Sequence, residues 1–312
     1  VEGPDAAALL DRTAANRLPL EGRMTLAPML NDRGSLIGDL TIGRLADDRF
    51  FLVGSSIAEL HYLRWFEKQR DALDVAVSSL LQTQCGLAIA GPRARELLSR
   101  VARADVSNDS FPFLSIRPLT IGPVQALVAR VSFTGELGYE IWTAPEQQRT
   151  LYDVLRDAGD ALGLRHFGAQ ALNSLRLEKG FGSWAREYRP IYTAAEAGLD
   201  RFVRPDKGAF IGRDAIMSEK ANGAHRLRLF EVDSADADAM GDEPIWRRDA
   251  VVGGVTSGGY GHTIGRSLAL GYVDRGLADL SDGFDIEILG ERRTARILKE
   301  APVDPPGARM RS

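Results

Sequence analysis

Cysteine is nearly absent from this chain of 312 residues, and the single Cys85 excludes an internal disulfide. We interpret Cys85 as a small buried apolar residue rather than a nucleophile, and we expect a reducing, cytoplasmic location. No apolar run approaches the roughly 20 residues that a membrane-spanning helix needs, so we expect no membrane segment. Lys and Arg number 39 against 43 acidic residues. This balance gives no general attraction to nucleic acid or to anionic membranes.

Several common motifs are also missing. The four histidines, His61, His166, His225 and His262, form no paired spacing with one another or with cysteine, which predicts that there is no metal site. The chain has no phosphate-binding Walker loop and no nucleophile elbow. The run Gly259–Gly265 has the wrong spacing for a dinucleotide fingerprint and lies between strand-like segments.

Periodicity predicts an α+β part followed by an all-β part. Runs at Met24–Leu30, Leu40–Leu45 and Phe50–Gly54 are typical of strands, and helices are expected over Ile57–Lys68 and Ala169–Lys179. Composition changes near Lys220–Ala224, which predicts domains at 1–220 and 225–312. Beyond this boundary the pattern alternates and predicts a small antiparallel β-barrel. Its expected strands are Arg226–Leu229, Ala250–Val252, Ser267–Val273, Asp285–Leu289 and Thr294–Leu298.

The first part contains an internal echo. Gly3-Pro4 and Gly91-Pro92 are each followed by apolar residues at helical spacing, with proline expected at the first helical position. Two strand–turn–helix units of similar design predict two related subdomains. Chance similarity between two Gly-Pro helix starts is the alternative.

A further helix start is predicted at Thr143-Ala-Pro-Glu146. Threonine followed three residues later by glutamate is the pattern of a capping box, and Pro145 suits the first helical turn. The residues Leu151, Val154, Leu155, Ala158 and Leu162 then supply one apolar face.

The segment Arg130–Glu140 is the most informative stretch of the sequence. It joins a strand to a turn containing Gly135 and returns into a second strand. Glu136 and Glu140 bracket the aromatic Tyr139, and a flat, nitrogen-rich ligand could use a carboxylate beside apolar neighbours. The alternative is an ordinary hairpin whose glutamates face water, with Arg130 as a solvated strand residue.

Three stretches together carry a family resemblance: Arg130–Glu140, Leu175–Trp184 and Val255–Val273. The chain resembles the folate-binding aminomethyltransferase family, which contains the glycine-cleavage T-protein. It is most similar to the folate-binding C-terminal half of dimethylglycine and sarcosine dehydrogenases. That similarity rests on Glu196-Ala-Gly-Leu199, on the run Asp206–Arg213 and on the closing Pro306–Arg311.

The resemblance implies a fold and a cofactor. It implies two related α/β lobes and a barrel arranged around a central channel that holds tetrahydrofolate. It also implies that the chain starts partway into the first lobe, and that FAD is involved only if an upstream domain supplies it. The expected partners are an N-methyl amine or its iminium, folate, and a flavin domain or subunit.

The resemblance also implies roles for particular residues. Asp39 corresponds to the catalytic aspartate of the family, and Gly38 replaces the aspartate that normally precedes it. Asp39 is expected at the start of a strand, after a glycine turn. Glu140 corresponds to the glutamate that holds the pterin, and Phe133 replaces a tyrosine, losing its hydroxyl. The other cofactor-binding candidates are Tyr139, Leu26, Thr41, Gly54, Trp142 and Arg309.

One departure separates this chain from a typical T-protein. An arginine that contacts folate in the T-protein is replaced here by Leu172, with Asn173 at the neighbouring aspartate. The resulting prediction is a folate-dependent one-carbon transfer module of the dehydrogenase type. The alternatives are a T-protein-like aminomethyltransferase, a folate-dependent demethylase, and a non-catalytic folate-binding regulatory protein.

Overall fold

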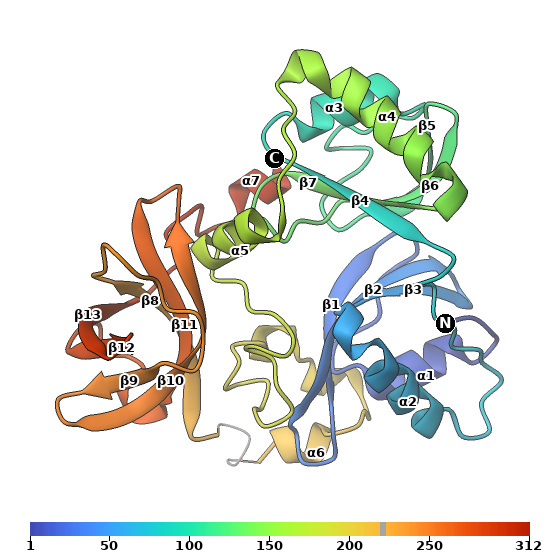
Figure 1. The fold of residues 1–312 in the computed structure, drawn as a ribbon. Helices are drawn as coiled ribbons and strands as arrows, with labels where there is room; N and C mark the ends of the chain where they lie inside the picture. Colours follow the sequence, from blue (N-terminus) through green and yellow to red (C-terminus); the bar gives the residue numbers. More distant parts are fainter. Residues whose placement is uncertain (219–222) are drawn as a thin grey trace.

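The computed structural model describes residues 1–218 and 223–312. Figure 1 shows three parts, two α/β lobes and a β-barrel, placed around helix α5 (Ala169–Glu178) and the irregular segment that follows it. The predicted boundary at Lys220–Ala224 falls largely on residues 219–222, which lie outside the described residues.

The first lobe is a three-stranded antiparallel sheet in the order β1-β2-β3, with two helices on one face. Side chains alternate across β2, so Leu40 and Ile42 pack under the helices while Asp39 and Thr41 point to the other face. We call the face away from the helices the inward face. The elements are α1 (Ala6–Thr13), β1 (Met24–Leu30), β2 (Leu36–Ala46), β3 (Arg49–Val53) and α2 (Glu59–Arg70).

The second lobe repeats this plan with a four-stranded sheet in the order β4-β7-β6-β5. Tyr139 and Ile141 of β7 lie in the core beneath the helices, so Glu140 and Trp142 lie on the inward face. The elements are β4 (Cys85–Ala90), α3 (Ala94–Val101), β5 (Ile116–Ile121), β6 (Val124–Ala129), β7 (Gly138–Thr143) and α4 (Gln148–Gly159).

The Gly-Pro echo marks equivalent places in the two lobes. Gly3 and Gly91 adopt φ of +132° and +126°, which favours glycine. The prediction that proline occupies the first helical position is wrong, because each helix begins two residues later, at Ala6 and Ala94. The Gly-Pro dipeptide instead forms a turn closed by Ala6 N–H to Gly3 O and by Ala94 N–H to Gly91 O, both 3.0 Å.

The inward faces of the two sheets pack against each other. Phe51 of β3 and Trp142 of β7 meet with ring centroids 4.9 Å apart. Main-chain hydrogen bonds also join the lobes, from Met24 N–H to Leu114 O at 2.8 Å. The buried members of this interlobe cluster are Met24, Phe51, Ile116 and Ala129.

The C-terminal part is a closed antiparallel barrel in the strand order β10-β11-β8-β13-β12-β9. All five predicted strands are present, which confirms the predicted fold class of an α+β region followed by a barrel. Strand β9 was not predicted because it is only four residues long and starts with proline. The strands are β8 (His225–Val232), β9 (Pro244–Arg247), β10 (Ala250–Gly261), β11 (Arg266–Asp274), β12 (Phe284–Ile288) and β13 (Glu291–Leu298).

Helix α5 docks the barrel onto the lobes. Buried Glu178 accepts hydrogen bonds from Thr263 N–H and Thr263 Oγ1, both 2.6 Å, at the turn after β10. Ser174 Oγ donates to Tyr260 O at 2.7 Å. Polar groups of one helix face are therefore satisfied by backbone groups and a hydroxyl of the barrel.

The segment after α5 ties the first lobe and the barrel together through two residues of the predicted motifs. Lys207 Nζ donates to the carbonyls of Asp11, Ala14 and Asn16, which closes the C-terminal end of α1. Glu196 Oε1 accepts from the N–H of Ala224 at 2.9 Å, where the barrel begins. The described residues also form two short helices, α6 (Arg213–Ile216) before the barrel and α7 (Ala308–Arg311) after it.

The predicted capping box at Thr143 is wrong. Thr143 is the last residue of β7, and its hydroxyl donates to Gln125 O at 3.0 Å on strand β6. A short 3₁₀ turn at Pro145–Gln147 leads into α4, which has no side-chain cap. Pairing within the sheet has overridden the local signal.

Candidate functional site

Asp39 lies on the inward face of the first lobe. It is in the interior of β2, opposite Pro28 of β1, and not at a strand start as expected, because β2 already begins at Leu36. Strand β3 pairs with β2 only as far as Thr41, opposite Val53. The edge of β2 beside Asp39 is therefore not covered by β3.

The Asp39 carboxyl is half-buried and incompletely paired. Its Oδ1 atom is buried and has no hydrogen-bond partner within the described chain. Burial raises the pKa of Asp39 to about 6, against smaller lowering effects of its own backbone and the Tyr62 hydroxyl. A carboxyl with that pKa can both hold and release a proton near neutral pH.

Tyr62 of α2 is the aromatic neighbour of Asp39, and two glycines make room for its ring. A Cβ on Gly38 would come within 2.5 Å of Tyr62 Cε1, and a Cβ on Gly54 within 2.9 Å of Tyr62 Cε2. The replacement of an aspartate by Gly38 therefore has a local reason, since no side chain fits there beside Tyr62. Gly54, predicted to contact the cofactor, lies against the same ring.

Glu140 lies on the inward face of the second lobe. Its cross-strand neighbours are Ala88 on β4 and Ala129 on β6, so small side chains flank it on both sides. The carboxylate of Glu140 makes no hydrogen bond or ion pair with any described residue. Burial raises the pKa of this half-buried carboxyl to about 7.

Three other candidates share these inward faces. Leu26 of β1 is paired with Thr41 of β2, two residue pairs along the ladder from Asp39. Trp142 of β7 follows Glu140 on the same face and packs in the interlobe cluster. The structure thus brings Leu26, Asp39 and Thr41 to one sheet face and Glu140 and Trp142 to the facing one.

Tyr139 lies apart from Glu140. Its side chain points to the helix side of the sheet, is fully buried, and stacks on Phe111 with centroids 5.9 Å apart. Strand periodicity gives the reason, since adjacent residues of β7 point to opposite faces. Tyr139 is therefore a core residue of the second lobe.

The C-terminal segment of the chain, which contains Arg309, contacts the loop that precedes β7, which contains Glu136. Arg309 Nη1 donates to Glu136 Oε1 at 2.6 Å, so this arginine, predicted to approach the cofactor, is paired at the surface. The alternative of a solvated Arg130 is wrong, because its side chain is fully buried and donates to Phe111 O and to the backbone oxygen of Ser312. Phe133 stacks on Phe181 with centroids 6.3 Å apart.

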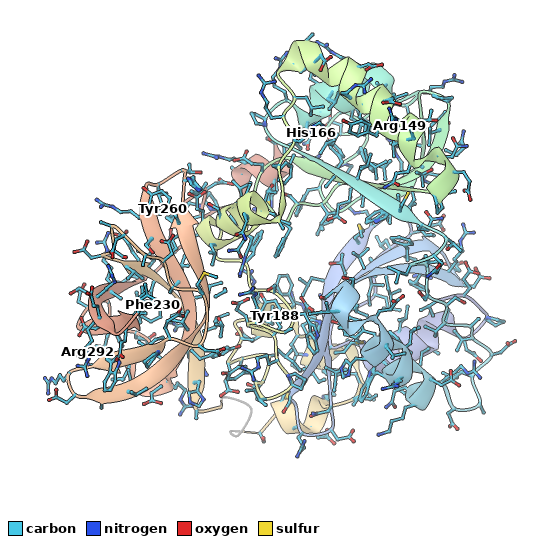
Figure 2. All side chains as sticks on the ribbon, viewed as in Figure 1. Arg149, His166, Tyr188, Phe230, Tyr260 and Arg292 are labelled. Atoms are coloured by element: carbon cyan, nitrogen blue, oxygen red, sulfur yellow. The ribbon has the colours of Figure 1, made fainter. Side chains whose placement is uncertain are left out.

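Tyr188 approaches Asp39 from the segment after α5. Figure 2 shows Tyr188 between the barrel and the first lobe, and the side chain is buried. Burial and the nearby Asp39 carboxylate raise the pKa of its phenol. Sequence reasoning missed both Tyr62 and Tyr188, and no motif marks either residue.

Within residues 1–218 and 223–312, no group of three or more His, Cys, Asp or Glu side chains could hold a metal ion. No helix in the same residues is long and apolar enough to cross a membrane.

The fold and the two facing carboxylates define a class: a two-lobed α/β protein with an appended antiparallel barrel. The profile described as "GCVT N-terminal domain" matches residues 1–207, and the "Glycine cleavage T-protein C-terminal barrel domain" matches residues 225–304. The chain belongs to the family of the glycine-cleavage T-protein, and the resemblance found in the sequence is confirmed.

Individual proteins of known function and one solved structure are similar to this chain. Dimethylglycine dehydrogenase of Mus musculus is 37% identical over 315 residues, which cover 100% of this chain and 36% of that protein. An aminomethyltransferase of Thermoanaerobacter is 29% identical and covers 96% of this chain and 82% of that protein. The chain thus spans about a third of the dehydrogenase. Aminomethyltransferase T of the Bartonella henselae glycine cleavage system shares the fold, with a TM-score of 0.85, 24% identity, and coverage of 97% and 83% of the two chains.

Adding a methyl group at Gly38 should destabilise the protein. We expect Gly38→Ala to lower the free energy of unfolding by about 1–3 kcal/mol, because a buried aromatic ring must move. Gly254→Ala is the matched strand control, since its Cβ would meet nothing within 4 Å and its change should stay within about 0.5 kcal/mol. Urea denaturation of both variants checks this, and equal effects would contradict the assigned packing.

Deprotonation of the half-buried Asp39 and Glu140 carboxyls should lower the stability of the protein at high pH. Because burial raises both pKa values, the native state holds these protons more tightly than the unfolded chain, and stability falls as pH rises through about 6 and about 7. Asp39→Asn and Glu140→Gln should each stabilise the ligand-free protein at pH 8 by about 1–3 kcal/mol, with little gain at pH 4. The exposed Glu146→Gln is the control, and a variant that is less stable than the parent at pH 8 would refute the account.

Proposed function

We propose that this chain binds reduced folate between the inward faces of its two lobes and transfers a one-carbon unit to it. The observation that carries the proposal is the pair Asp39 and Glu140, two half-buried carboxyls on facing sheets, both lacking a full set of protein partners. Buried polar groups are normally hydrogen-bonded, so an unpaired pair suits a ligand rather than the fold.

Glu140 is the group we propose for recognising the pterin. A carboxylate can accept two parallel N–H groups from the amide and amino edge of a flat ring. The small side chains of Ala88 and Ala129 flank Glu140 across the sheet and add little bulk beside its carboxylate. Apolar neighbours on the same inward faces, Leu26 and Trp142, suit the ring faces.

Asp39 is the group we propose for moving the proton. When bound, tetrahydrofolate would supply the ring nitrogens that take up the one-carbon unit. While ionised, Asp39 would stabilise the positive charge that appears as the ring nitrogen bonds to the one-carbon unit, and it would then accept the proton that this nitrogen loses. Passing that proton to the amine nitrogen would allow the amine to leave as its bond to the one-carbon unit breaks. The Asp39 pKa of about 6 leaves this carboxyl mostly ionised, and so able to act as a base, at neutral pH.

The donor we propose is the iminium of an N-methyl amine, supplied by a flavin domain or subunit. The relation to dimethylglycine dehydrogenase supports this choice. The second candidate is aminomethyl transfer as in the glycine cleavage system, favoured by the aminomethyltransferase that this chain matches over most of its length. Presenting formaldehyde with a secondary amine, or an aminomethylated lipoyl protein, to the same preparation distinguishes the two donors.

Glu140→Gln tests the recognition site. Loss of a charge-assisted contact costs about 1.5–3 kcal/mol, so the Kd for tetrahydrofolate measured by calorimetry should rise more than tenfold. The exposed Glu146→Gln should leave the Kd unchanged. An unaltered Kd in Glu140→Gln would remove Glu140 from the site.

Asp39→Asn tests the chemical step. We expect folate affinity within a few fold of the parent and a methylene transfer rate lower by about a hundredfold, as for the loss of an acid–base group. Stopped-flow formation of 5,10-methylenetetrahydrofolate provides the rate. Equal rates in variant and parent would make Asp39 a structural residue.

A further inference from the structure

Two buried polar atoms beside each other have no hydrogen-bond partner. They are Asp39 Oδ1 and the Tyr62 hydroxyl, which both lack partners of normal geometry in the described chain. The two groups are nevertheless close enough for each to influence the titration of the other. An unpaired buried donor next to an unpaired buried acceptor is costly unless the two can meet.

The surroundings hold the Tyr62 ring in one orientation. The ring is confined between Gly38 and Gly54, and Met29 Cε would also lie 2.9 Å from a Cβ at Gly38. Because β3 ends opposite Thr41, the ring lies where a further strand residue would otherwise cover the edge of β2. Its hydroxyl therefore has Asp39 as its polar neighbour.

Tyr188 is the other phenol near Asp39, and its hydroxyl lies against the backbone of Gly182. A Cβ on Gly182 would come within 2.8 Å of the Tyr188 hydroxyl oxygen, so the phenol lies against the backbone of that residue. The Gly182 backbone also acts on the titration of this phenol. Tyr62 is the phenol whose buried hydroxyl, like Asp39 Oδ1, has no hydrogen-bond partner in the described chain, and it is the phenol that lowers the pKa of Asp39.

We propose that Tyr62 is a positioning residue that donates its hydroxyl hydrogen to the Asp39 carboxylate and fixes the direction of this carboxylate on the inward face. The inference rests on the proposed function for its catalytic meaning, but the contact itself is a property of the free protein. Tyr62 needs no contact with the folate or with the one-carbon donor.

The direction of the expected effect follows from the groups around Asp39. A donor to the ionised carboxylate lowers its pKa, whereas burial raises it by more, which brings the pKa of Asp39 to about 6. Tyr62 from α2 is the titratable group that lowers the pKa of Asp39, while the Asp39 carboxylate in turn raises the pKa of Tyr188, which faces it from the segment after α5. Removing the Tyr62 hydroxyl should remove this lowering effect on the pKa of Asp39. Burial then raises the pKa further, so Asp39 should titrate at a higher pH.

Tyr62→Phe is the decisive variant, because phenylalanine keeps the ring between Gly38 and Gly54 and removes only the donor. In full-length protein labelled with ¹³C at aspartate carboxyls, the Asp39 signal, assigned by its absence in Asp39→Asn, should titrate about one pH unit higher than in the parent. The acidic limb of the transfer rate should shift by the same amount, with the rate recovering at pH 8.5. Tyr152→Phe on α4 is the matched control and should change neither.

A second measurement does not depend on the folding of that variant. In the parent, the ¹³Cζ signal of a tyrosine that donates to Asp39 should follow the Asp39 titration, and Asp39→Asn should abolish this response. The signal must persist in Tyr188→Phe, because otherwise Tyr188 is the donor and the proposal is overturned. An Asp39 midpoint unchanged or lowered in Tyr62→Phe also overturns it. A shifted midpoint in a protein that fails to bind tetrahydrofolate would instead refute the proposed function alone.

Discussion

The buried carboxylate of Glu187 is the interaction that fixes helix α5 and the segment after it against the barrel. Its Oε2 accepts from Arg176 Nη1 at 3.2 Å and from Ser183 N–H at 2.8 Å, while Oε1 accepts from Thr256 Oγ1 at 2.8 Å and from Ser257 Oγ. Helix α5, the segment after it and the barrel therefore converge on one side chain. A buried ion pair recovers its desolvation cost only when its remaining lone pairs are satisfied, and here they are. The next residue along the chain is Tyr188, so the same contacts place a phenol beside Asp39.

The contrast between Glu187 and the two site carboxyls separates structural from ligand-directed groups. Glu178, Glu187 and Glu196 are all buried, and each accepts hydrogen bonds from backbone or hydroxyl donors. Asp39 and Glu140 are less buried, yet no comparable set of donors surrounds them. The fold supplies enough donors to satisfy three buried glutamates. A shortage of donors therefore does not explain why Asp39 and Glu140 lack partners. Their exposure on facing sheets is better explained by a ligand that supplies the missing hydrogen bonds.

The strands and the barrel could be predicted from the sequence because their signals are local. Period-two alternation in β12 and β13 reflects burial on one side of each strand, which the residues themselves encode. Asp39 and Glu140 were found through motifs that resemble a family, and their placement on facing sheets agrees with that assignment without testing their roles. Tyr62 and Glu187 could not be predicted, because their contacts join residues that lie far apart in the sequence. The Thr143 capping box failed for the same reason, since its hydroxyl is taken by the neighbouring strand.

Gly38 shows how a local departure from a family pattern can have a distant cause. Read in the sequence alone, the missing aspartate is simply a lost carboxylate next to the catalytic candidate. In the structure, the space that its side chain would occupy contains the Tyr62 ring, 2.5 Å from the position of a Cβ. A second carboxylate at this place would also lie beside Asp39 and raise its pKa further by repulsion, whereas a phenol can donate to it. With glycine at position 38, the Tyr62 ring can lie next to Asp39, and the hydrogen bond proposed above then gives this aspartate a donor instead of a competing charge.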